Sequence, residues 1–597
     1  MVLYPSSVSI SVPVSKLRFQ AQAKNDKLRR PSNLPAAERF KIRMSTTPSS
    51  GAASAPPRPN VARNAGIVSI AIMASRVLGL VRDQVFATLF GAGLQYDAFL
   101  TAFRIPNLLR DLFAEGALSA AFVTTFSQVL AKKGEAEAFR LSNRVATLLM
   151  LLLGIICIAG WLAAPDLVHL LAPGFFEVPG KAPLTIHLTR IMIPFLFFIA
   201  LAAKAMGILN AMHRFGVPAM ASAFFNIGSI VGGLLLGFVI GPSLGLGAIE
   251  GMAYGTLFGG FLQFAVQWPS LRKVGFRYRP ELSFTDPGVR QIMALMGPAI
   301  IGAAAVQINI FVNSNFASSI IDPTTGRVGN GPVSWLNYAF RFVQFPIGAF
   351  GVAISTATLP LISAAAARKE TVEFRRTLAH SLGLIFLLCL PSAAGLIVLR
   401  EPIVGLIFEH GRFTSFDTVQ TAAALAAYAI GLAGYGGVKV LAPAFYALDD
   451  ALTPMLVSLG SVVVNYIINY LLVGPLGHVG LACSTSAVAL VNFALLLALM
   501  RRRLGRIEGR RLASSMIRIS LATAAMAAAV WLVAIAPAGQ LPFTGFKLYL
   551  AQVVLGMGTA AAVFYPACRL FRVEELNEAV AAVTSRFRKK AAASFSP

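Results

Sequence analysis

Arginine and aspartate side chains stand inside long apolar runs near the start of this chain. The first apolar run contains Arg76, Arg82 and Asp83, and the second contains Arg104 and Arg110. An ionisable side chain is costly inside a membrane segment, so by default it marks a substrate or ion pathway. Guanidinium groups bind phosphate and pyrophosphate through paired hydrogen bonds. Because cations outnumber acids at the deeper positions, we expect a site for a phosphorylated anion rather than for a cationic drug.

The spacing of these arginines limits how they can act together. Arg76 and Arg82 are six residues apart, as are Arg104 and Arg110, which separates each pair by about 9 Å along a helix and about 120° around it. They therefore suit a wide cavity better than one narrow stripe. Structural alternatives remain open for some of them. Arg82 could snorkel at a helix end, and Arg110 could form a structural ion-pair cluster with the acids that follow it.

A second, weaker candidate site consists of Asn465 and Asn469, which are four residues apart and share one helix face. With backbone carbonyls they could hold a cation such as Na⁺, but ordinary hydrogen bonding between helices is the simpler interpretation. The sequence contains no Walker motif, no HExxH pair and no CxxC motif. We therefore expect no catalytic residues, no metal and no cofactor. Coupling to the membrane potential or to a Na⁺ or H⁺ gradient stays open.

These charges belong to a chain with the composition of an α-helical membrane protein. Of its 597 residues, 56% are hydrophobic and 13% are charged, about half the charged share of a soluble protein. The apolar residues form runs of about 20, long enough to cross a membrane as helices. We predict an all-α integral membrane fold of about fourteen spans. Their approximate limits are 65–90, 97–130, 145–171, 184–212, 218–241, 247–268, 289–320, 333–364, 379–408, 416–448, 452–474, 478–500, 513–536 and 545–571.

The basic residues concentrate in alternate loops. The loops after spans 2, 6, 8 and 12 are rich in Lys and Arg, as are both ends of the chain, whereas the loops between them carry little charge. The positive-inside rule then places both termini in the cytoplasm, which an even number of spans also requires. The same distribution accounts for the net charge of +26. We therefore do not expect the chain to bind nucleic acid.

An internal repeat organises the first twelve spans as two copies of six. Ala102-Phe103-Arg104 matches Ala339-Phe340-Arg341, Lys204 matches Lys439, and Pro218 matches Pro454, all at nearly the same offset. Parallel repeats of this kind typically hold substrate between two lobes that rock for alternating access. The predicted divisions are an N-lobe of residues 61–275, a C-lobe of residues 276–505 and two added helices in residues 506–575.

The two ends of the chain differ from the apolar body. Residues 1–60 are basic and rich in Ser and Pro, and we predict that they are disordered. They could be a cytoplasmic tail, the product of a translation start placed too early with Met44 as the true start, or an organelle transit peptide. Residues 576–597 are predicted to form a basic cytoplasmic tail.

Several motifs resemble the MurJ (MviN) family of the multidrug/oligosaccharidyl-lipid/polysaccharide exporter superfamily, over about residues 60 to 575. The first group of motifs is Ser75-Arg76-Val77-Leu78-Gly79, Arg82-Asp83, Phe90-Gly91-Ala92-Gly93, Asp97-Ala98-Phe99, Pro106-Asn107-Leu108-Leu109-Arg110, Phe113-Ala114-Glu115-Gly116-Ala117 and Ala121-Phe122-Val123. The second group is Trp335 to Ala339 with Arg341, Pro346-Ile347-Gly348, Gly351-Val352-Ala353, Lys439 to Pro443 and Phe445-Tyr446-Ala447.

The resemblance implies a lipid II flippase of a bacterial inner membrane, used for cell-wall synthesis. Its partner would be lipid II, the undecaprenyl-pyrophosphate-linked MurNAc-pentapeptide-GlcNAc, among membrane lipids and in contact with the cell-wall synthesis machinery. It also implies a transporter rather than an enzyme, with fourteen helices whose last pair forms a groove for the lipid tail. Together with Arg104, which the sequence indicates by itself, the implied substrate-binding residues are Arg76, Arg82, Asp97, Asn107, Arg110, Glu115 and Arg341.

Two positions depart from the family's pattern. Phe340 stands where the family often has Asp before the arginine, and Asp111 stands where it frequently has a second basic residue. Asp111 is therefore expected to pair with Arg110. The alternatives are an exporter of another polyprenyl-linked glycan or of a small molecule, a membrane glycosyltransferase or phosphatase, and a scaffold without transport. The outer loops are short and lack clustered acids, which disfavours an enzyme, and the cavity arginines disfavour a scaffold.

Overall fold

The computed structural model describes residues 61–111, 119–321, 326–505, 508–540 and 542–577. Helices dominate these ranges, and the only pairing of extended backbone within them is an isolated bridge between Ile321 and Val328. The predicted all-α fold is therefore confirmed. Residues 1–60 and 578–597, which include most of both predicted tails, lie outside the described residues, as does Glu115.

The predicted N-lobe, residues 61–275, contains nine α-helices within the described part of the chain. They are α1 (Val61–Phe90), α2 (Leu94–Arg110), α3 (Ser119–Leu162), α4 (Ala164–Leu171), α5 (Lys181–Met192), α6 (Phe195–Ala211), α7 (Gly216–Leu234), α8 (Ala248–Ala265) and α9 (Trp268–Lys273) among the described residues. Short turns of other helix types, η2 (Pro173–Glu177), η3 (Leu235–Val239) and η4 (Gly241–Leu244), connect some of them.

The rest of the chain continues the all-helical pattern. The predicted C-lobe, residues 276–505, contains α10 (Pro287–Ser318), α11 (Pro332–Pro346), η5 (Ile347–Gly351), α12 (Val352–Ala367), α13 (Thr371–Val398), α14 (Arg400–Phe408), α15 (Ser415–Ile430), α16 (Leu432–Tyr446) and α17 (Leu452–Leu504). The added C-terminal helices are α18 (Gly509–Val530), η6 (Trp531–Ile535), η7 (Ala538–Gln540) and α19 (Gly545–Leu570).

Many of these helices are suited to a membrane. Among the described residues, eight are long and apolar enough to cross it, or nine if the bent pair Ser415–Ile430 and Leu432–Tyr446 forms one span. The composition and the length of these helices are those of an integral membrane protein. The count of fourteen stays a prediction.

Two glycines interrupt helices where the sequence predicts loops. Gly134 in α3 has φ +81° and Gly477 in α17 has φ +55°. Only glycine adopts this left-handed region without strain, so each helix breaks there. The break at Gly477 divides α17 where predicted spans 11 and 12 meet, and the break at Gly134 falls in the predicted loop after span 2.

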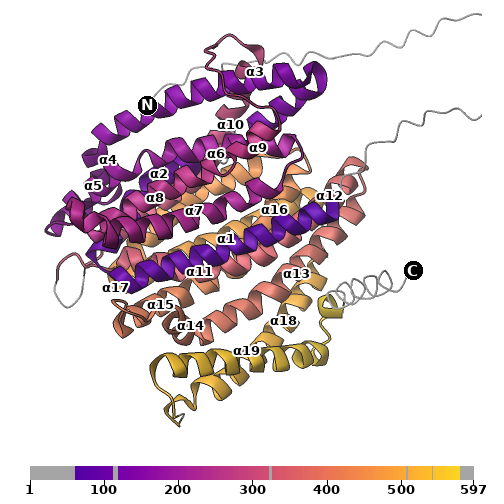
Figure 1. Cartoon of the computed structure of the whole chain (residues 1–597). Coiled ribbons are helices and arrows are strands. Elements are labelled where there is room, and N and C mark those ends of the chain that lie inside the picture. The colour runs from indigo at the N-terminus through magenta and orange to yellow at the C-terminus, as the bar shows by residue number, and fades with distance from the viewer. Residues whose placement is uncertain (1–60, 112–118, 322–325, 506–507, 541, 578–597) are drawn as a thin grey trace, which may run out of the picture. The chain divides into compact units, whose positions relative to one another are not determined.

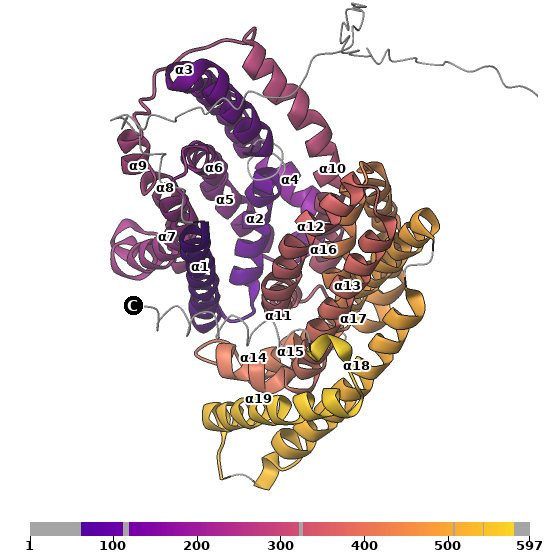
Figure 2. The ribbon, with the colours of Figure 1, turned by 90° about the vertical axis from the view of Figure 1, so that its right-hand side faces the viewer.

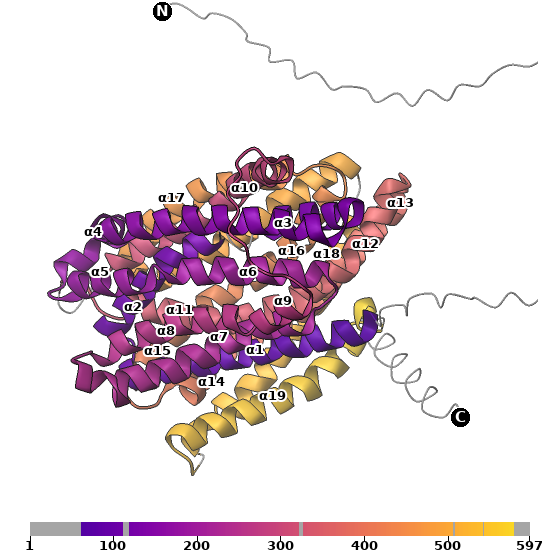
Figure 3. The same cartoon turned by 45° about the horizontal axis from the view of Figure 1, so that its top comes forward.

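The helices of residues 61–577 run side by side, and those of the two lobes face each other across α1, α2 and α11 (Figure 2). The same near-parallel arrangement is visible after a tilt of the view (Figure 3). Within the N-lobe, α7 and α8 approach closely because glycines face each other. A Cβ at Gly228 would lie 2.8 Å from the backbone of Gly259, which is the small-residue packing that membrane helices use.

The added helices pack on the C-lobe. Figure 1 shows α18 and α19 beside α13 and α14, and these helices are in contact. Tyr549 of α19 donates a hydrogen bond to Glu409, with 3.1 Å between the Tyr549 Oη and a carboxylate oxygen. The described part of the C-terminal pair therefore packs on helices of the predicted C-lobe.

Candidate functional site

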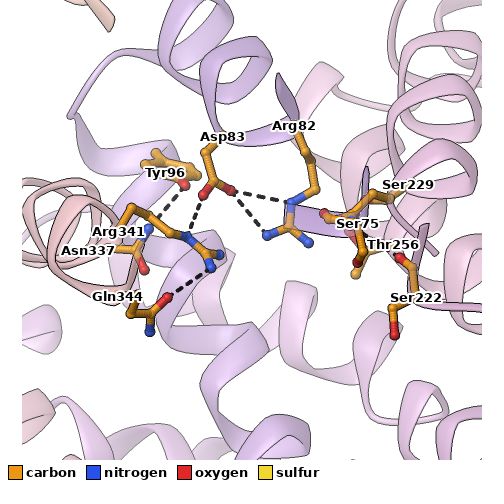
Figure 4. A network of polar contacts seen from close by, with 11 residues as sticks. Ser75, Arg82, Asp83, Tyr96, Ser222, Ser229, Thr256, Asn337, Arg341 and Gln344 are labelled. Carbon is orange, nitrogen blue, oxygen red and sulfur yellow. Dashed lines mark hydrogen bonds and ion pairs between the residues drawn. The ribbon is translucent and has the colours of Figure 1, made fainter. Parts of the chain in front are cut away.

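One buried carboxylate joins arginines of the two lobes. Asp83 of α1 accepts hydrogen bonds from Arg82 Nε and Nη2 at 3.3 and 3.1 Å, and its other oxygen lies 2.5 Å from Arg341 Nε of α11. Only 1% of Asp83 is exposed. Figure 4 shows Asp83 between the two guanidinium groups. We call Arg82, Asp83 and Arg341 the triad. It brings together two predicted site residues from segments far apart in the sequence.

The triad lines a pocket between the lobes. One wall comes from α1 and α2 and the other from α11. Aromatic rings and polar groups share the lining. The residues are Arg82, Asp83, Phe86, Tyr96, Phe99, Leu100, Phe103, Arg104, Asn107, Thr256, Asn337 and Arg341. Four of the predicted substrate-binding residues, Arg82, Arg104, Asn107 and Arg341, therefore meet in one pocket.

Arg104 differs from the arginines of the triad. Among the described residues, no carboxylate lies within ion-pair distance of Arg104, although the charged groups of Arg341 and Asp111 and the neutral Tyr428 lie nearby. The guanidinium donors of this half-buried side chain are therefore available to a ligand that supplies a hydrogen-bond acceptor. Asn107, three residues along the same helix, has a buried Oδ1 that accepts no hydrogen bond within the described part of the chain. This edge of the pocket offers both a donor and an acceptor.

Arg110 has a partner in the adjacent acid. Its Nη2 lies 2.9 Å from Asp111 Oδ1, and Asp111 Oδ2 accepts a hydrogen bond from Gln307 of α10 at 3.4 Å. The predicted pairing of Asp111 with Arg110 is confirmed. This pair links α2 to the C-lobe beside the pocket rather than lining the pocket itself.

Arg76 lies on α1 against η5 of the opposite lobe. A Cβ at Gly348 would overlap the Arg76 guanidinium, so the glycine leaves the space that this side chain occupies. Arg76 does not line the pocket. The structure thus places it at the lobe interface, away from the triad's immediate surroundings.

Asp97 occupies a different site from the arginines. Its carboxylate is fully buried and accepts hydrogen bonds from Lys181 Nζ at 2.9 Å, Gly331 N at 2.8 Å, and Ser334 N and Oγ at 2.9 and 2.6 Å. Lys181 also donates to Asn330 Oδ1 at 3.0 Å. We call Asp97, Lys181, Asn330 and Ser334 the clasp. It ties α2 and α5 of the N-lobe to the start of α11.

The clasp contains residues that sequence reasoning missed. Lys181 and Ser334 carry no motif, and Lys181 stands 84 residues from its partner Asp97. One signal could have indicated Lys181. It is a lysine in a loop with few charges, and it stands at the first residue of α5. Asp97 is a predicted substrate-binding residue, but its carboxylate accepts hydrogen bonds from four donors within the protein and does not line the pocket.

The two asparagines of the weaker candidate site do lie together. Asn465 and Asn469 both donate to Asn313 Oδ1 of α10, at 2.9 and 2.8 Å. Ser484 donates to Asn465 Oδ1 at 3.0 Å. The expected hydrogen bonding between helices is confirmed, and cation binding there stays a prediction.

The repeat-related lysines have unlike surroundings. Lys204 is 5% exposed, and its Nζ lies 4.9 Å from the ring centre of Phe276 and 5.7 Å from that of Phe122. Lys439 is exposed and its stem contacts Gly351. The two positions match in sequence without sharing an environment.

Comparisons with known proteins agree on one family. The profile described as "Lipid II flippase MurJ" matches residues 86–550. The chain is 36% identical to a "Lipid II flippase MurJ" of Burkholderia cenocepacia over 433 residues, 72% of this chain and 81% of that protein. It is 37% identical to a "Probable lipid II flippase MurJ" of Vibrio cholerae over 437 residues, again 72% and 81%.

Solved structures show the same fold. A structure titled "Lipid II flippase MurJ, inward closed conformation" matches with a TM-score of 0.68 and 27% identity, covering 84% of this chain and 98% of that one. An inward-facing multidrug resistance MATE family transporter of the MOP superfamily matches with a TM-score of 0.59 and 17% identity, covering 74% and 99%. The second match supports the fold alone.

Proposed function

The chain belongs to the MurJ family of lipid II flippases, and from this premise we propose that it carries lipid II from the inner to the outer leaflet of a bacterial cytoplasmic membrane. The protein is a transporter and not an enzyme. Its substrate is a polyprenyl pyrophosphate that bears a disaccharide and a peptide. The function therefore requires a polar path for the headgroup while the prenyl chain stays in lipid.

The triad is the observation that carries this proposal. Arg82 and Arg341 come from opposite lobes and share the single carboxylate of Asp83. A pyrophosphate offers more oxygens than a carboxylate and can bind two guanidinium groups in bidentate fashion. We infer that it replaces Asp83 as the shared acceptor. Because the two arginines belong to different lobes, this exchange couples substrate binding to the relative position of the lobes.

The net charge of the site supports an anionic substrate. Three arginines, Arg82, Arg104 and Arg341, line the pocket together with one carboxylate, that of Asp83. Charges in a water-excluded site interact more strongly than in bulk water. Repulsion between the cations raises the free energy of the empty site, and an anionic ligand lowers it. The pyrophosphate and the peptide carboxylates of lipid II are ligands of this kind.

The clasp supports alternating access. The positive-inside rule assigns its end of the helices to the outer side of the membrane and both termini to the cytoplasm. With the clasp formed, the outer side is closed. Opening it must break the hydrogen bonds that Asp97 and Lys181 make to the C-lobe. We propose that the substrate enters with the clasp intact and leaves after the clasp opens.

The energy source of the cycle is proposed to be the membrane potential or an ion gradient. Asn465 and Asn469 are the candidate ion site within the C-lobe. Supporting this, Asn469 Oδ1 is buried and accepts no hydrogen bond among the described residues. A transport measurement at fixed membrane potential, with and without a Na⁺ or H⁺ gradient, decides between these sources.

Complementation tests the proposal in cells. Bacteria depleted of their own lipid II flippase would express the intact chain, Arg82→Ala, Arg341→Ala or the control Arg190→Ala. Arg190 packs over the Trp161 ring at 4.9 Å, is half-buried and lies outside the pocket. We expect growth with the intact chain and the control, and lysis with the two pocket variants at equal membrane levels. Lysis with every protein would contradict the proposal.

The remaining alternative is export of another polyprenyl-linked glycan or of a small molecule. It would show as correct insertion without rescue of the depleted cells. The lipid-linked intermediate that accumulates in the native host after deletion would then identify the substrate. Rescue would instead favour lipid II as the substrate. Contact with the cell-wall synthesis machinery can then be tested by co-purification from crosslinked membranes.

A further inference from the structure

Three aromatic side chains cluster on the C-lobe side of the pocket. Phe340 of α11 has its ring centre 5.1 Å from that of Tyr428 and 6.3 Å from that of Tyr435, with interplanar angles of 63° and 71°. The three residues come from α11, α15 and α16. Phe340 and Tyr435 are half-buried rather than fully enclosed. Part of this aromatic cluster therefore stays uncovered by the protein.

Helix geometry directs this cluster toward the pocket. Asn337 and Arg341 line the pocket from α11, and Phe340 stands between them in the sequence. At 3.6 residues per turn, these three side chains fall within about 100° of the helix circumference. From the opposite wall, the pocket residue Arg104 lies near Tyr428. Both observations place the aromatic cluster beside the pocket, adjacent to the lining residues Asn337 and Arg341 rather than in the lining itself.

Polar groups lie at the edge of the same region. Arg104 brings guanidinium donors and has no carboxylate partner among the described residues. Asn107 Oδ1 is buried and accepts no hydrogen bond within the described ranges. Buried polar atoms are normally satisfied, so Asn107 Oδ1 points to a ligand that supplies a donor, and the adjacent Arg104 guanidinium can donate to an acceptor of the same ligand.

An aromatic surface rimmed by hydrogen-bonding groups matches the chemistry of a sugar. A pyranose ring has faces of C–H groups, which pack on the electron-rich face of an aromatic ring. Its hydroxyl and acetamido groups point outward and form hydrogen bonds with polar groups at the rim. A prenyl chain would need no rim of this kind, and a pyrophosphate would need no aromatic surface.

We propose that Phe340, Tyr428 and Tyr435, with Arg104 and Asn107, bind the disaccharide of the substrate beside the pyrophosphate at the triad. This inference rests on the proposed function, because it names the subsite for one part of lipid II. Arg104 and Asn107 hold the sugar by its polar groups, and the aromatic cluster supports one ring face. The chain thereby distinguishes a glycosylated polyprenyl pyrophosphate from a bare one.

Equilibrium binding to the purified full chain tests the proposal with two probes, lipid II and undecaprenyl pyrophosphate. We expect Phe340→Leu to weaken lipid II binding by about five- to tenfold and to leave undecaprenyl pyrophosphate binding within about twofold. Tyr435→Leu should act in the same direction. Phe340→Tyr keeps the aromatic face and should bind both probes like the parent. Phe198→Leu is the matched control, because Phe198 contacts Phe261 in the N-lobe away from the pocket.

Each outcome has one meaning. Loss confined to lipid II supports the sugar subsite. Equal loss for both probes, or no loss for either, overturns it. If the parent chain binds undecaprenyl pyrophosphate but not lipid II, or binds neither, the proposed function itself fails, and this result is distinct because it appears before any substitution. A Phe340→Tyr variant that behaves like Phe340→Leu would also overturn the assignment.

Discussion

Removal of one hydroxyl from the clasp should release the outer side of the protein. Ser334 Oγ lies 2.6 Å from Asp97 Oδ1, and its backbone N–H donates to the same oxygen. Ser334→Ala deletes only the hydroxyl bond, and alanine is compatible with the helix. The carboxylate keeps its other donors, so the fold should persist.

The size of the effect follows from the type of bond. A hydrogen bond to a charged group contributes about 1.5–3 kcal/mol. In the open state both groups would be hydrated, so the substitution penalises the closed state alone. The ratio of open to closed molecules should then rise by about 10- to 150-fold. Asp97→Asn should shift the ratio further, because it also leaves the buried ammonium of Lys181 without its anion.

Distances between two spin labels measure this shift. Glu177 of the N-lobe and Ser415 of the C-lobe are exposed at the clasp end, and each can carry a label once the four native cysteines are replaced. We expect Ser334→Ala to increase the population at the longer distance. Ser319→Ala is the control, since Ser319 is exposed at the same end and makes no bond to Asp97. Unchanged distances in both Ser334→Ala and Asp97→Asn would refute the role of the clasp.

Three further predictions concern other parts of the structure. Asp83→Asn should strengthen lipid II binding several-fold, because the competing carboxylate is gone. It should also slow transport, because the carboxylate no longer displaces the pyrophosphate from the arginines. Weaker binding would contradict this prediction. Gly348→Ala should displace the flexible end of Arg76 and reduce transport with little change in melting temperature, as measured by thermal unfolding beside a flipping assay. Outside the membrane spans, the Thr453 backbone N–H, its hydroxyl and Arg503 lower the pKa of Asp450 against desolvation. This contribution is complete above the unfolded-state pKa and is lost as pH falls through the folded-state pKa, so the melting-temperature advantage over Asp450→Asn should shrink in acid; a constant difference would argue against it.

The helices could be predicted well because apolar runs of sufficient length can only be helices in a membrane. Each predicted span falls on one or more of the described helices, and Gly134 and Gly477 mark breaks at predicted loops. The number of spans could not be fixed in this way. Short helices such as α4 and α14 each follow a long helix after a break of one residue, which hydropathy does not report.

The pocket could be predicted only in part. Arg82 and Arg341 attract attention because each is a charge in an apolar run, and Arg110 pairs with Asp111 because the two are adjacent. The pairing of Arg341 with Asp83 could not be predicted, because it depends on how helices far apart in the sequence pack. Nothing near Asp97 in the sequence indicates that Lys181 and Ser334 fill its hydrogen bonds.

Transport by the purified protein tests the central claim most directly. The chain would be reconstituted into vesicles with fluorescent lipid II, and a membrane-impermeant quencher would report how much of the probe changes leaflet. We predict movement with the parent chain and with Arg190→Ala, and its loss with Arg82→Ala and with Arg341→Ala. Equal movement in all four proteins would contradict a role for the triad, and no movement in any of them would contradict the assignment as a lipid II flippase.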